Sequence, residues 1–299
     1  MQTFIRVTEI WLPSRDRSRL EFGDGLYGPL SEFRAVSERT GFAYDEGLPG
    51  KSWAARHPII LKDLQNSYFL RGEAAKAAGL TCAVALPVMA GDILLAVVVF
   101  LCGDDAEHVG AIELWHNNAA LNAEMGLVDG YYGTADAFGW LSRNTKFTRG
   151  SGLPGLAWKS GLPVVLHDLG RAHSFLRWED GSKVGMNKGM AIPYRDEEGG
   201  QTWVMTFISA QGTPIARRFE LWTRDPAHDG LVLQAGDGLA APAGEGGSAP
   251  APVQRGEGLI GRAWSSCAPV VEDAPETGAA VAIPFLDGAR VTAVVVWRF

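Results

Sequence analysis

Two arginines in matching places could bind an anion. Arg71 and Arg177 each follow a Phe-Leu pair, and a guanidinium makes paired, charge-assisted hydrogen bonds with carboxylates and phosphates. The alternative interpretation is that both arginines lie on the surface or cap a helix, where an exposed ion pair contributes little to stability. Both interpretations stay open from the sequence.

Three cysteines are the other candidates for chemistry. Cys82, Cys102 and Cys267 are an odd number with neither a Cys-x-x-Cys pair nor Cys/His spacing, so we expect no disulfide framework and no metal site. Cys82 and Cys102 lie in apolar strand patterns, where a free cysteine usually packs as a small hydrophobic residue. A catalytic role would require the two thiols within disulfide reach, with a Cα separation below about 7 Å.

A third motif excludes nucleotide hydrolysis. Gly50-Lys51-Ser52 ends like a phosphate-binding loop, but the first glycine of such a loop is missing at the required distance. Leu156 and Arg262 replace the lysine in the two stretches that match this one.

These candidates lie in three copies of one unit. The pattern Gly-x-x-Gly-x-x-Trp begins at residues 47, 152 and 258, and the pattern Glu-apolar-Trp begins at residues 9, 113 and 220. A third pattern, a proline and two β-branched residues leading to an aspartate, begins at residues 58, 163 and 269. The period is too long for a solenoid repeat and fits a small domain.

The first copy is predicted to open with a strand over residues 4–12, a weak strand over 20–22 and a short helix over 30–39. After the glycine motif, a short strand ends at Asp63, a helix runs to Ala78, and two strands joined by a Gly-containing turn close the copy. The third copy lacks the helix. Its residues 235–256 are rich in Gly, Ala and Pro, so we expect a flexible loop there.

This order of motifs resembles the GAF domain family over essentially the whole chain. The resemblance divides the chain into domain 1 (residues 1–110), domain 2 (111–218) and a reduced domain 3 (219–299). It implies an α+β fold of tandem GAF-like domains, each with a central antiparallel sheet, flanking helices, and a pocket between the sheet and the crossover segment. Many GAF domains sense small molecules in that pocket, and many others are dimerisation or regulatory modules.

The resemblance also implies which residues line the pockets. They are Trp53, Asp63, Phe69, Arg71 and Cys82 in domain 1, and Trp158, Asp168, Phe175, Arg177 and Lys188 in domain 2. The alternative interpretation makes the tryptophans core anchors and the aspartates caps or turns. Domain 3, without its crossover helix, is expected to have no closed pocket and to serve for packing or docking.

No known GAF cofactor is assigned. Asn187-Lys188 resembles part of the motif of cyclic-nucleotide GAF domains, but Gln211-Gly212 stand where that motif has Asp-Glu. The Cys-His pair that holds a covalent bilin is absent from the sequence. His173 is the positional candidate for a haem ligand, and a surface histidine is the alternative interpretation.

The expected function is that of a non-enzymatic regulatory or sensory protein. It would bind a small ligand in domain 1 or 2, dock a partner protein or a second copy of itself, or do both. One alternative is an interaction scaffold whose pockets are collapsed. A second alternative is a thiol-based reductase resembling the free methionine-(R)-sulfoxide reductases, with Cys82 and Cys102 as its thiols.

Net charge and hydropathy argue against two classes of partner, nucleic acids and membranes. The net charge is −7 and no Lys/Arg cluster is present, which argues against nucleic-acid binding. No apolar run approaches the roughly 20 residues that span a bilayer, and the first residues do not resemble a secretory signal. We therefore expect no membrane contact and a cytoplasmic location.

Overall fold

The computed structural model describes residues 3–103, 106–171, 175–196, 200–225, 229–236, 250–274 and 278–299. The haem-ligand candidate His173 and residues 237–249 of the Gly/Ala/Pro-rich stretch lie outside this description.

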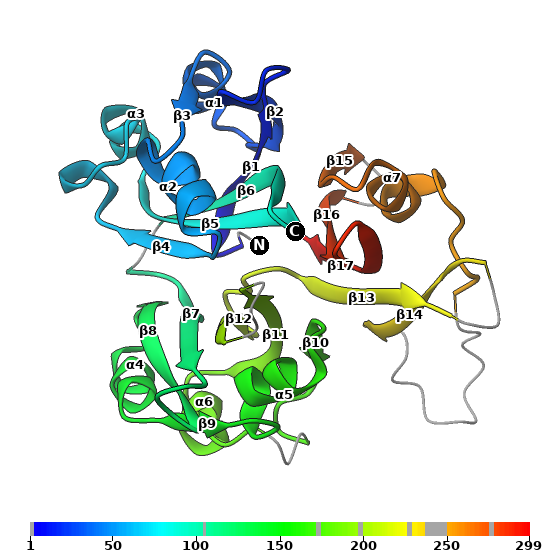
Figure 1. The fold of residues 1–299 in the computed structure, drawn as a ribbon. Helices are drawn as coiled ribbons and strands as arrows, with labels where there is room; N and C mark the ends of the chain where they lie inside the picture. The colour runs from blue at the N-terminus through cyan, green and yellow to red at the C-terminus, as the bar shows by residue number, and fades with distance from the viewer. Residues whose placement is uncertain are drawn as a thin grey trace.

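Each third of the chain forms its own antiparallel sheet (Figure 1). Domain 1 contains β1 (Ile5–Pro13), β2 (Arg19–Leu26), α1 (Ser31–Ser37), β3 (Gly41–Ala43), α2 (Gly47–Ala55), β4 (Ile59–Lys62), the 3-10 turn η1 (Leu64–Asn66), α3 (Gly72–Ala77), β5 (Leu80–Ala90) and β6 (Ile93–Gly103). Domain 2 contains β7 (Val109–Asn118), β8 (Glu124–Gly133), α4 (Asp136–Arg143), β9 (Lys146–Thr148), α5 (Gly152–Ser160), β10 (Val164–Leu166), α6 (Trp178–Lys183), β11 (Met186–Arg195) and β12 (Gln201–Ala210). Domain 3 contains β13 (Arg218–Arg224), β14 (Leu231–Gly236), α7 (Gly258–Ser266), β15 (Val270–Ala274), β16 (Gly278–Asp287) and β17 (Arg290–Arg298).

The three sheets share one strand order. It is β3-β2-β1-β6-β5-β4 in domain 1, and in the same direction β9-β8-β7-β12-β11-β10 in domain 2. The described residues of domain 3 give β14-β13-β17-β16-β15, which lacks the outermost strand that β3 and β9 supply. The predicted α+β class, with central antiparallel sheets and flanking helices, is therefore confirmed.

The second glycine of each repeated motif is required by a close approach of the backbone. A Cβ atom at this position would lie within 2.3 Å of a carbonyl oxygen in the segment just before the helix. Only glycine permits that approach, which sets α2, α5 and α7 directly against the preceding chain. The three glycines are Gly50, Gly155 and Gly261, and their contacts are Ala43, Thr148 and Gln254.

A proline ends the pairing of each short edge strand. Pro87, Pro193 and Pro284 each lie within a long strand and pair with a residue of the neighbouring central strand. The short strand on the other side ends its pairing two residues earlier, at Ala85, Ala191 and Ala282. Because proline has no N–H to donate, the ladder cannot continue along that side. The prolines thus fix one end of β4, β10 and β15.

The two faces of each sheet pack against different partners. Along β5, Ala83 and Ala85 face α2 and α3, whereas Val84 and Leu86 join a core shared with the other domains. With both faces covered, the central strands β6, β12 and β17 are almost continuously apolar and buried.

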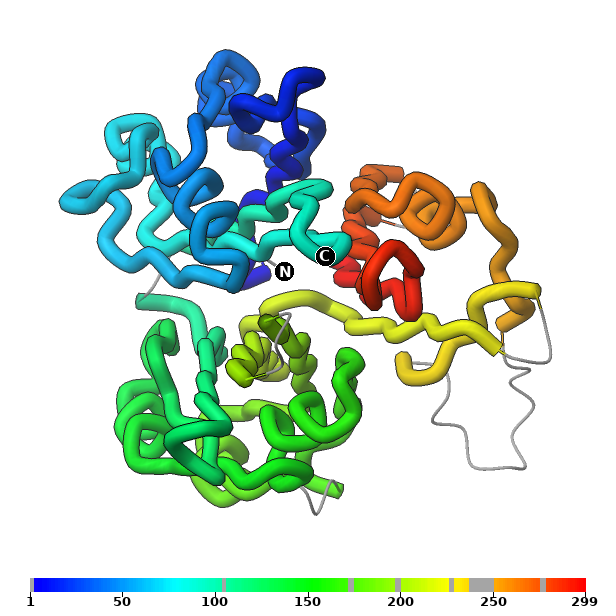
Figure 2. Tube along the Cα trace, viewed as in Figure 1, coloured from blue at the N-terminus to red at the C-terminus, as the bar shows by residue number. Residues whose placement is uncertain are grey.

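The shared core is centred on three aromatic residues in equivalent strand positions. Phe100, Phe207 and Trp297 contact one another with ring centroids 5.4, 5.7 and 5.9 Å apart. They follow the residues of β6, β12 and β17 that pair with Glu9, Glu113 and Glu220. The three domains are therefore grouped about one common centre, as Figure 2 shows.

The domains contact one another in a closed ring. The short strand of each domain lies against the second strand of the next: β4 against β8, β10 against β14, and β15 against β2. When the same contact between two different surfaces is repeated from one domain to the next, it forms a closed ring if the rotation between successive domains is right. In this protein the ring closes within a single chain, and the contact between domains 3 and 1 is the closing one.

One prediction for domain 3 needs correction. The stretch expected as a loop from residue 235 begins inside β14, which includes Ala235 and Gly236. Near its other end, Val253 forms an isolated bridge with Leu231, with N–O distances of 2.8 and 2.9 Å. Backbone pairing therefore orders both described ends of a stretch whose composition suggested a loop throughout.

Of the helices in the described ranges, none has the length and apolar character needed to cross a membrane.

A histidine stacks across the interface between domains 1 and 2. His57 lies just before β4, and its ring stacks on Trp203 of β12 at 4.5 Å. Burial lowers the pKa of His57; its hydrogen bond to the carbonyl of Pro58 opposes this shift, and nearby His116 adds to it. The folded protein therefore resists protonation of this ring.

We predict that this interface weakens in mild acid. A histidine whose folded pKa is depressed destabilises the protein as the pH falls below the unfolded value of 6.5. The free energy of unfolding should therefore fall between pH 7.5 and 5.5. His57→Gln should flatten that dependence. Urea unfolding followed by circular dichroism at both values measures it, and an equal fall in the variant would contradict the assignment to His57.

Candidate functional site

Each full domain encloses one glutamate–arginine pair. In domain 1, Glu9 comes from β1 and Arg71 directly precedes α3. The two guanidinium nitrogens of Arg71 donate to the two carboxylate oxygens of Glu9, at 2.5 and 2.8 Å. In domain 2, Glu113 of β7 and Arg177 before α6 make the same paired contact. All four side chains are buried, with exposed fractions of 0 to 4%.

Strand alternation places the glutamate inside the domain. Val7, Glu9 and Trp11 alternate along β1, and Val7 and Trp11 both pack in the core beneath the helices. A carboxylate on that face loses its hydration and needs a counter-charge. The crossover segment supplies it, because the burial of Phe69 brings Arg71 over the sheet.

Further donors surround each carboxylate. Glu9 accepts hydrogen bonds from Trp11 Nε1 at 3.0 Å, Tyr27 Oη at 3.0 Å and Ser37 Oγ at 2.8 Å. In domain 2 the donors to Glu113 are Trp115, Tyr132 and Thr206. Charged groups left in a protein interior are stable only when they are satisfied in this way.

The electrostatics keep both glutamates ionised. Burial acts to raise the pKa of Glu9, but the charge of Arg71 and the hydrogen bonds from Arg71, Ser37 and Trp11 outweigh it, and the pKa is lowered. The same balance lowers the pKa of Glu113. Burial and the adjacent carboxylate raise the pKa of Tyr27, so its hydroxyl remains a donor at neutral pH.

Four aromatic rings surround each guanidinium. The rings around Arg71 have centroids 5.0 to 5.8 Å from its Cζ, and those around Arg177 lie at 4.6 to 5.8 Å. Such cation–π contacts gain strength when the charge is desolvated. The rings are those of Trp11, Phe33, Phe42 and Phe69 in domain 1 and of Trp115, Phe138, Phe147 and Phe175 in domain 2.

Side chains of the protein itself therefore surround the guanidinium groups of Arg71 and Arg177. Arg71 and Arg177 are not surface arginines, and the anion that each one binds is an internal carboxylate. The structure thus brings Phe69 with Arg71, and Phe175 with Arg177, into one cluster in each domain.

The sequence itself carries a signal for these buried glutamates. A glutamate between apolar residues of a buried strand, found three times, requires a buried partner of opposite charge. Glu9 and Glu113 could have been paired with the repeated arginines on that ground. Tyr27 and Ser37 carry no comparable signal.

Four other predicted residues lie towards the outside. Trp53 and Trp158 are half-buried. Asp63 and Asp168 are exposed and accept backbone N–H groups of Asn66 and Gly170, respectively, as turn-capping aspartates do.

Cys82 and Lys188 lie at equivalent places on the opposite side of the sheet. Cys82 pairs with Cys102 and Lys188 pairs with Ser209 in the two ladders. Cys82 belongs to the core shared between domains, and the ammonium of Lys188 donates to the carbonyl of Arg217 in the connector to domain 3. Neither residue shares the space around the arginine clusters.

Domain 3 has the same repeated glutamate, Glu220, but its arginine partner comes from a different element. Glu220 accepts hydrogen bonds from Trp222 Nε1 at 2.9 Å and from Arg298 Nε at 2.5 Å. Arg298 comes from β17 and is partly exposed. The ion pair here bridges neighbouring strands of the sheet, not the sheet and a crossover segment.

An exposed aromatic surface covers α2 in domain 1. Tyr44 is 60% exposed and meets Trp53 edge to face at 5.2 Å. Lys51 lies over the ring of Tyr68 at 5.3 Å, and Leu70 beside it is 56% exposed. We call these five residues the α2 surface.

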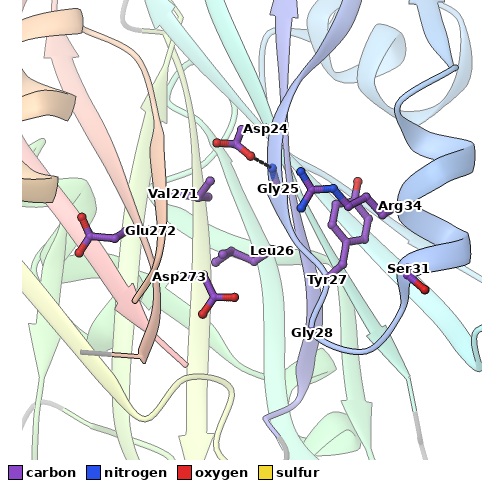
Figure 3. Close-up of a pocket in the computed structure, with 10 residues that line it drawn as sticks. All are labelled: Asp24, Gly25, Leu26, Tyr27, Gly28, Ser31, Arg34, Val271, Glu272 and Asp273. Carbon is purple, nitrogen blue, oxygen red and sulfur yellow. Dashed lines mark hydrogen bonds between the residues drawn. The ribbon is translucent and has the colours of Figure 1, made fainter. Parts of the chain in front are cut away.

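A cavity of about 400 Å³ lies between domains 1 and 3, where the ring closes (Figure 3). Its domain 1 wall comes from β2 and α1, and its domain 3 wall from β15. The residues are Asp24, Gly25, Leu26, Tyr27, Gly28, Ser31 and Arg34 on one side and Val271, Glu272 and Asp273 on the other. Sequence patterns could not locate it, because each wall belongs to a different repeat.

Comparison with known proteins gives structural neighbours only. No family model matches the chain, and no curated protein matches it. Similar solved structures are mostly GAF domains. The GAF domain of A. aeolicus nlh2 is 17% identical with a TM-score of 0.27, covering 33% of this chain and 58% of that one. A GAF domain/HD domain protein of Geobacter sulfurreducens is 19% identical with a TM-score of 0.29, covering 34% and 65%.

The neighbours also include an enzyme. The free methionine-R-sulfoxide reductase of Neisseria meningitidis is 11% identical with a TM-score of 0.26, covering 33% of this chain and 52% of that one. This chain thus spans about half to two thirds of the length of these structures. Each match covers about one domain's worth of this chain.

We predict strong coupling between Glu9 and Arg71. Glu9→Gln or Arg71→Met should each lower the free energy of unfolding by about 3–5 kcal/mol, because each leaves one buried charge unpaired. The double variant should lose clearly less than the two single losses combined. Urea unfolding of the four proteins measures this coupling.

The matched control is Glu38→Gln, which breaks the exposed Arg34–Glu38 pair. It should change stability by no more than about 0.5 kcal/mol. Losses as small as this for the Glu9 and Arg71 variants would contradict the structural role of the buried pair.

Proposed function

We propose that the protein is a non-enzymatic regulatory protein that acts by docking a partner protein on its surface. The observation that carries this proposal is that a buried glutamate of the chain already pairs with Arg71, and another with Arg177. Both terminal nitrogens of each arginine already bind a carboxylate, and the remaining donor, Nε, is buried. Recognition therefore falls to the exterior.

The α2 surface supports the docking part of the proposal. Tyrosine and tryptophan are enriched at protein interfaces because they combine apolar area with a polar tip. The equivalent of Leu70 in domain 2, Leu176, is also exposed, at 59%. Both full domains thus present an apolar side chain next to their buried arginine.

Site-specific photocrosslinking in the source cells tests this function. A photoreactive amino acid at Leu70 should give a discrete crosslinked species with another chain. The control position is Leu121, which is 75% exposed on the β7–β8 connection. Crosslinks of equal yield from both positions, or none from Leu70, would count against docking at the α2 surface.

Thiol oxidoreduction is the second candidate, and one observation favours it. Cys82 and Cys102 are direct partners in the antiparallel ladder of β5 and β6, and such partners have Cα atoms about 4.5–5.5 Å apart. Two observations favour the regulatory proposal instead. Both cysteines are fully buried, and both belong to the core shared between domains, away from α2 and α3.

The reactivity of the thiols separates the two functions. In the native protein, an aromatic disulfide reagent should modify Cys267, which is partly exposed, while Cys82 and Cys102 should react only after unfolding. Cys267→Ser should therefore abolish the native reaction, and Cys82→Ser should leave it unchanged. A fast native reaction at Cys82, or a reversible Cys82–Cys102 disulfide found by mass spectrometry, would favour the reductase.

A further inference from the structure

We propose that the exposed face of α4 in domain 2 binds the same face of a second copy of this chain, about a two-fold axis that passes close to Trp140. This inference goes beyond the proposed docking function and does not depend on it, because it concerns another domain and another surface. It rests on an exposed tryptophan, on two opposite charges along the same helix, and on the internal repeat.

Trp140 lies near the middle of α4 and points away from the core of domain 2. Its side chain is 66% exposed, more than any other aromatic residue in the part of the chain that the structure describes. Figure 1 shows α4 on the outer side of domain 2, away from domain 3. A tryptophan in this setting leaves a large apolar area in water, and such residues are enriched at interfaces.

Two further apolar side chains lie beside α4. Leu176 is 59% exposed, and Trp178 at the start of α6 is 36% exposed. Arg177 lies between these two in the sequence, and it reaches α4 through its hydrogen bond to Ser142. Trp140 therefore belongs to an apolar surface that extends from α4 to α6.

Domain 1 shows that the fold does not require this tryptophan. Ser37 of α1 and Ser142 of α4 are equivalent, because each accepts a hydrogen bond from the buried arginine of its own domain. Two residues earlier, domain 1 has the exposed Ala35 and domain 2 has Trp140. Since α1 covers the same kind of buried ion pair with an alanine at this position, the indole of Trp140 serves a contact outside the domain.

The same face of α4 carries one charge of each sign. Asp136, Trp140 and Arg143 stand at positions i, i+4 and i+7 of the helix, which places them on one face. Asp136 and Arg143 are both exposed. Among the described residues, neither of them forms an ion pair within the chain. We call these three residues the α4 stripe.

The spacing makes the α4 stripe complementary to itself. At 1.5 Å per residue, Asp136 and Arg143 lie about 10 Å apart along the helix, and their midpoint falls within about 1 Å of Trp140. When two copies of α4 pack antiparallel about that midpoint, each Asp136 faces the partner's Arg143 and the two indoles meet at the centre. A two-fold interface requires this kind of self-complementarity.

Charge also favours a second copy at this surface over one at the matching helix of domain 1. Two chains that each carry a net charge of −7 repel one another, so a surface that binds its own copy needs pairs of opposite charge. The positions of α1 that match the α4 stripe hold Ser31, Ala35 and Glu38. Glu38 already pairs with Arg34 at 2.7 Å. The helix α1 therefore offers a second copy neither an apolar centre nor matched charges.

The size of the surface sets the expected strength of the contact. Two short helices and the neighbouring side chains of α6 bury less than the roughly 1,200–2,000 Å² of a stable protein interface. We therefore expect a weak dimer that dissociates on dilution. Most of its binding energy should come from the paired indoles, since buried tryptophans at the centre of an interface dominate affinity.

Sedimentation velocity of the whole chain, from about 1 to about 100 µM, tests the proposal. We expect the sedimentation coefficient to rise from that of a monomer towards that of a dimer. Trp140→Ala should weaken self-association about tenfold or more, because it removes the indole from both sides of the centre. The matched control is Tyr44→Ala, which removes a 60% exposed aromatic residue from the α2 surface and should leave self-association unchanged.

Charge reversal gives a second test that leaves Trp140 in place. Asp136→Arg alone and Arg143→Asp alone should each abolish self-association, because like charges then face each other on both sides of the axis. An equal mixture of the two variants should associate again, because a copy with two arginines then faces a copy with two aspartates. Circular dichroism confirms that each variant is folded. A chain that stays monomeric throughout this range, a dimer that survives Trp140→Ala, or a mixture that remains monomeric would overturn the proposal.

Discussion

The buried glutamate–arginine pair is the constraint on which each full domain depends. Glu9 lies on the apolar face of β1, where an ionised carboxylate is stable only with a matched cation and satisfied oxygens. Arg71 meets that need from 62 residues further along the chain. The crossover segment is therefore held down over the sheet, and the aromatic rings from β1, α1, β3 and the segment itself close around the guanidinium. One ion pair organises the helices, the sheet and the core.

The other face of each sheet is committed to the other domains. Phe100, Phe207 and Trp297 meet at the common centre, so the face that a solitary domain would expose is buried inside the chain. The outer surface over the helices and the interfaces between domains remain accessible to a partner. The α2 surface is of the first kind, and the cavity beside Asp24 is of the second.

The repeated motifs made the antiparallel sheets and their flanking helices predictable, because a glycine forced by a close backbone approach and a proline that ends an edge strand recur wherever the same local geometry recurs. The interior was predicted only in part. The sequence leaves open whether Arg71 and Arg177 bind an anion or lie on the surface, since nothing local shows that Glu9 and Glu113 face them. The cavity was out of reach, because sequence periodicity does not say that β15 lies against β2. The loop predicted from residue 235 is wrong at its first two residues, because β14 continues through Gly236 and pairs there with β13.

The closed ring has a consequence for how this protein can vary. Three identical subunits would have three identical seams, so any change at one would appear at all of them, and dilution would separate the subunits. Here the three seams are encoded separately and their partners are tethered, which keeps the local concentration of each domain high at any dilution. One interface can thus hold the stack of His57 on Trp203 without imposing it on the other two. The chain is arranged like a cyclic oligomer, but each of its three interfaces can carry different residues.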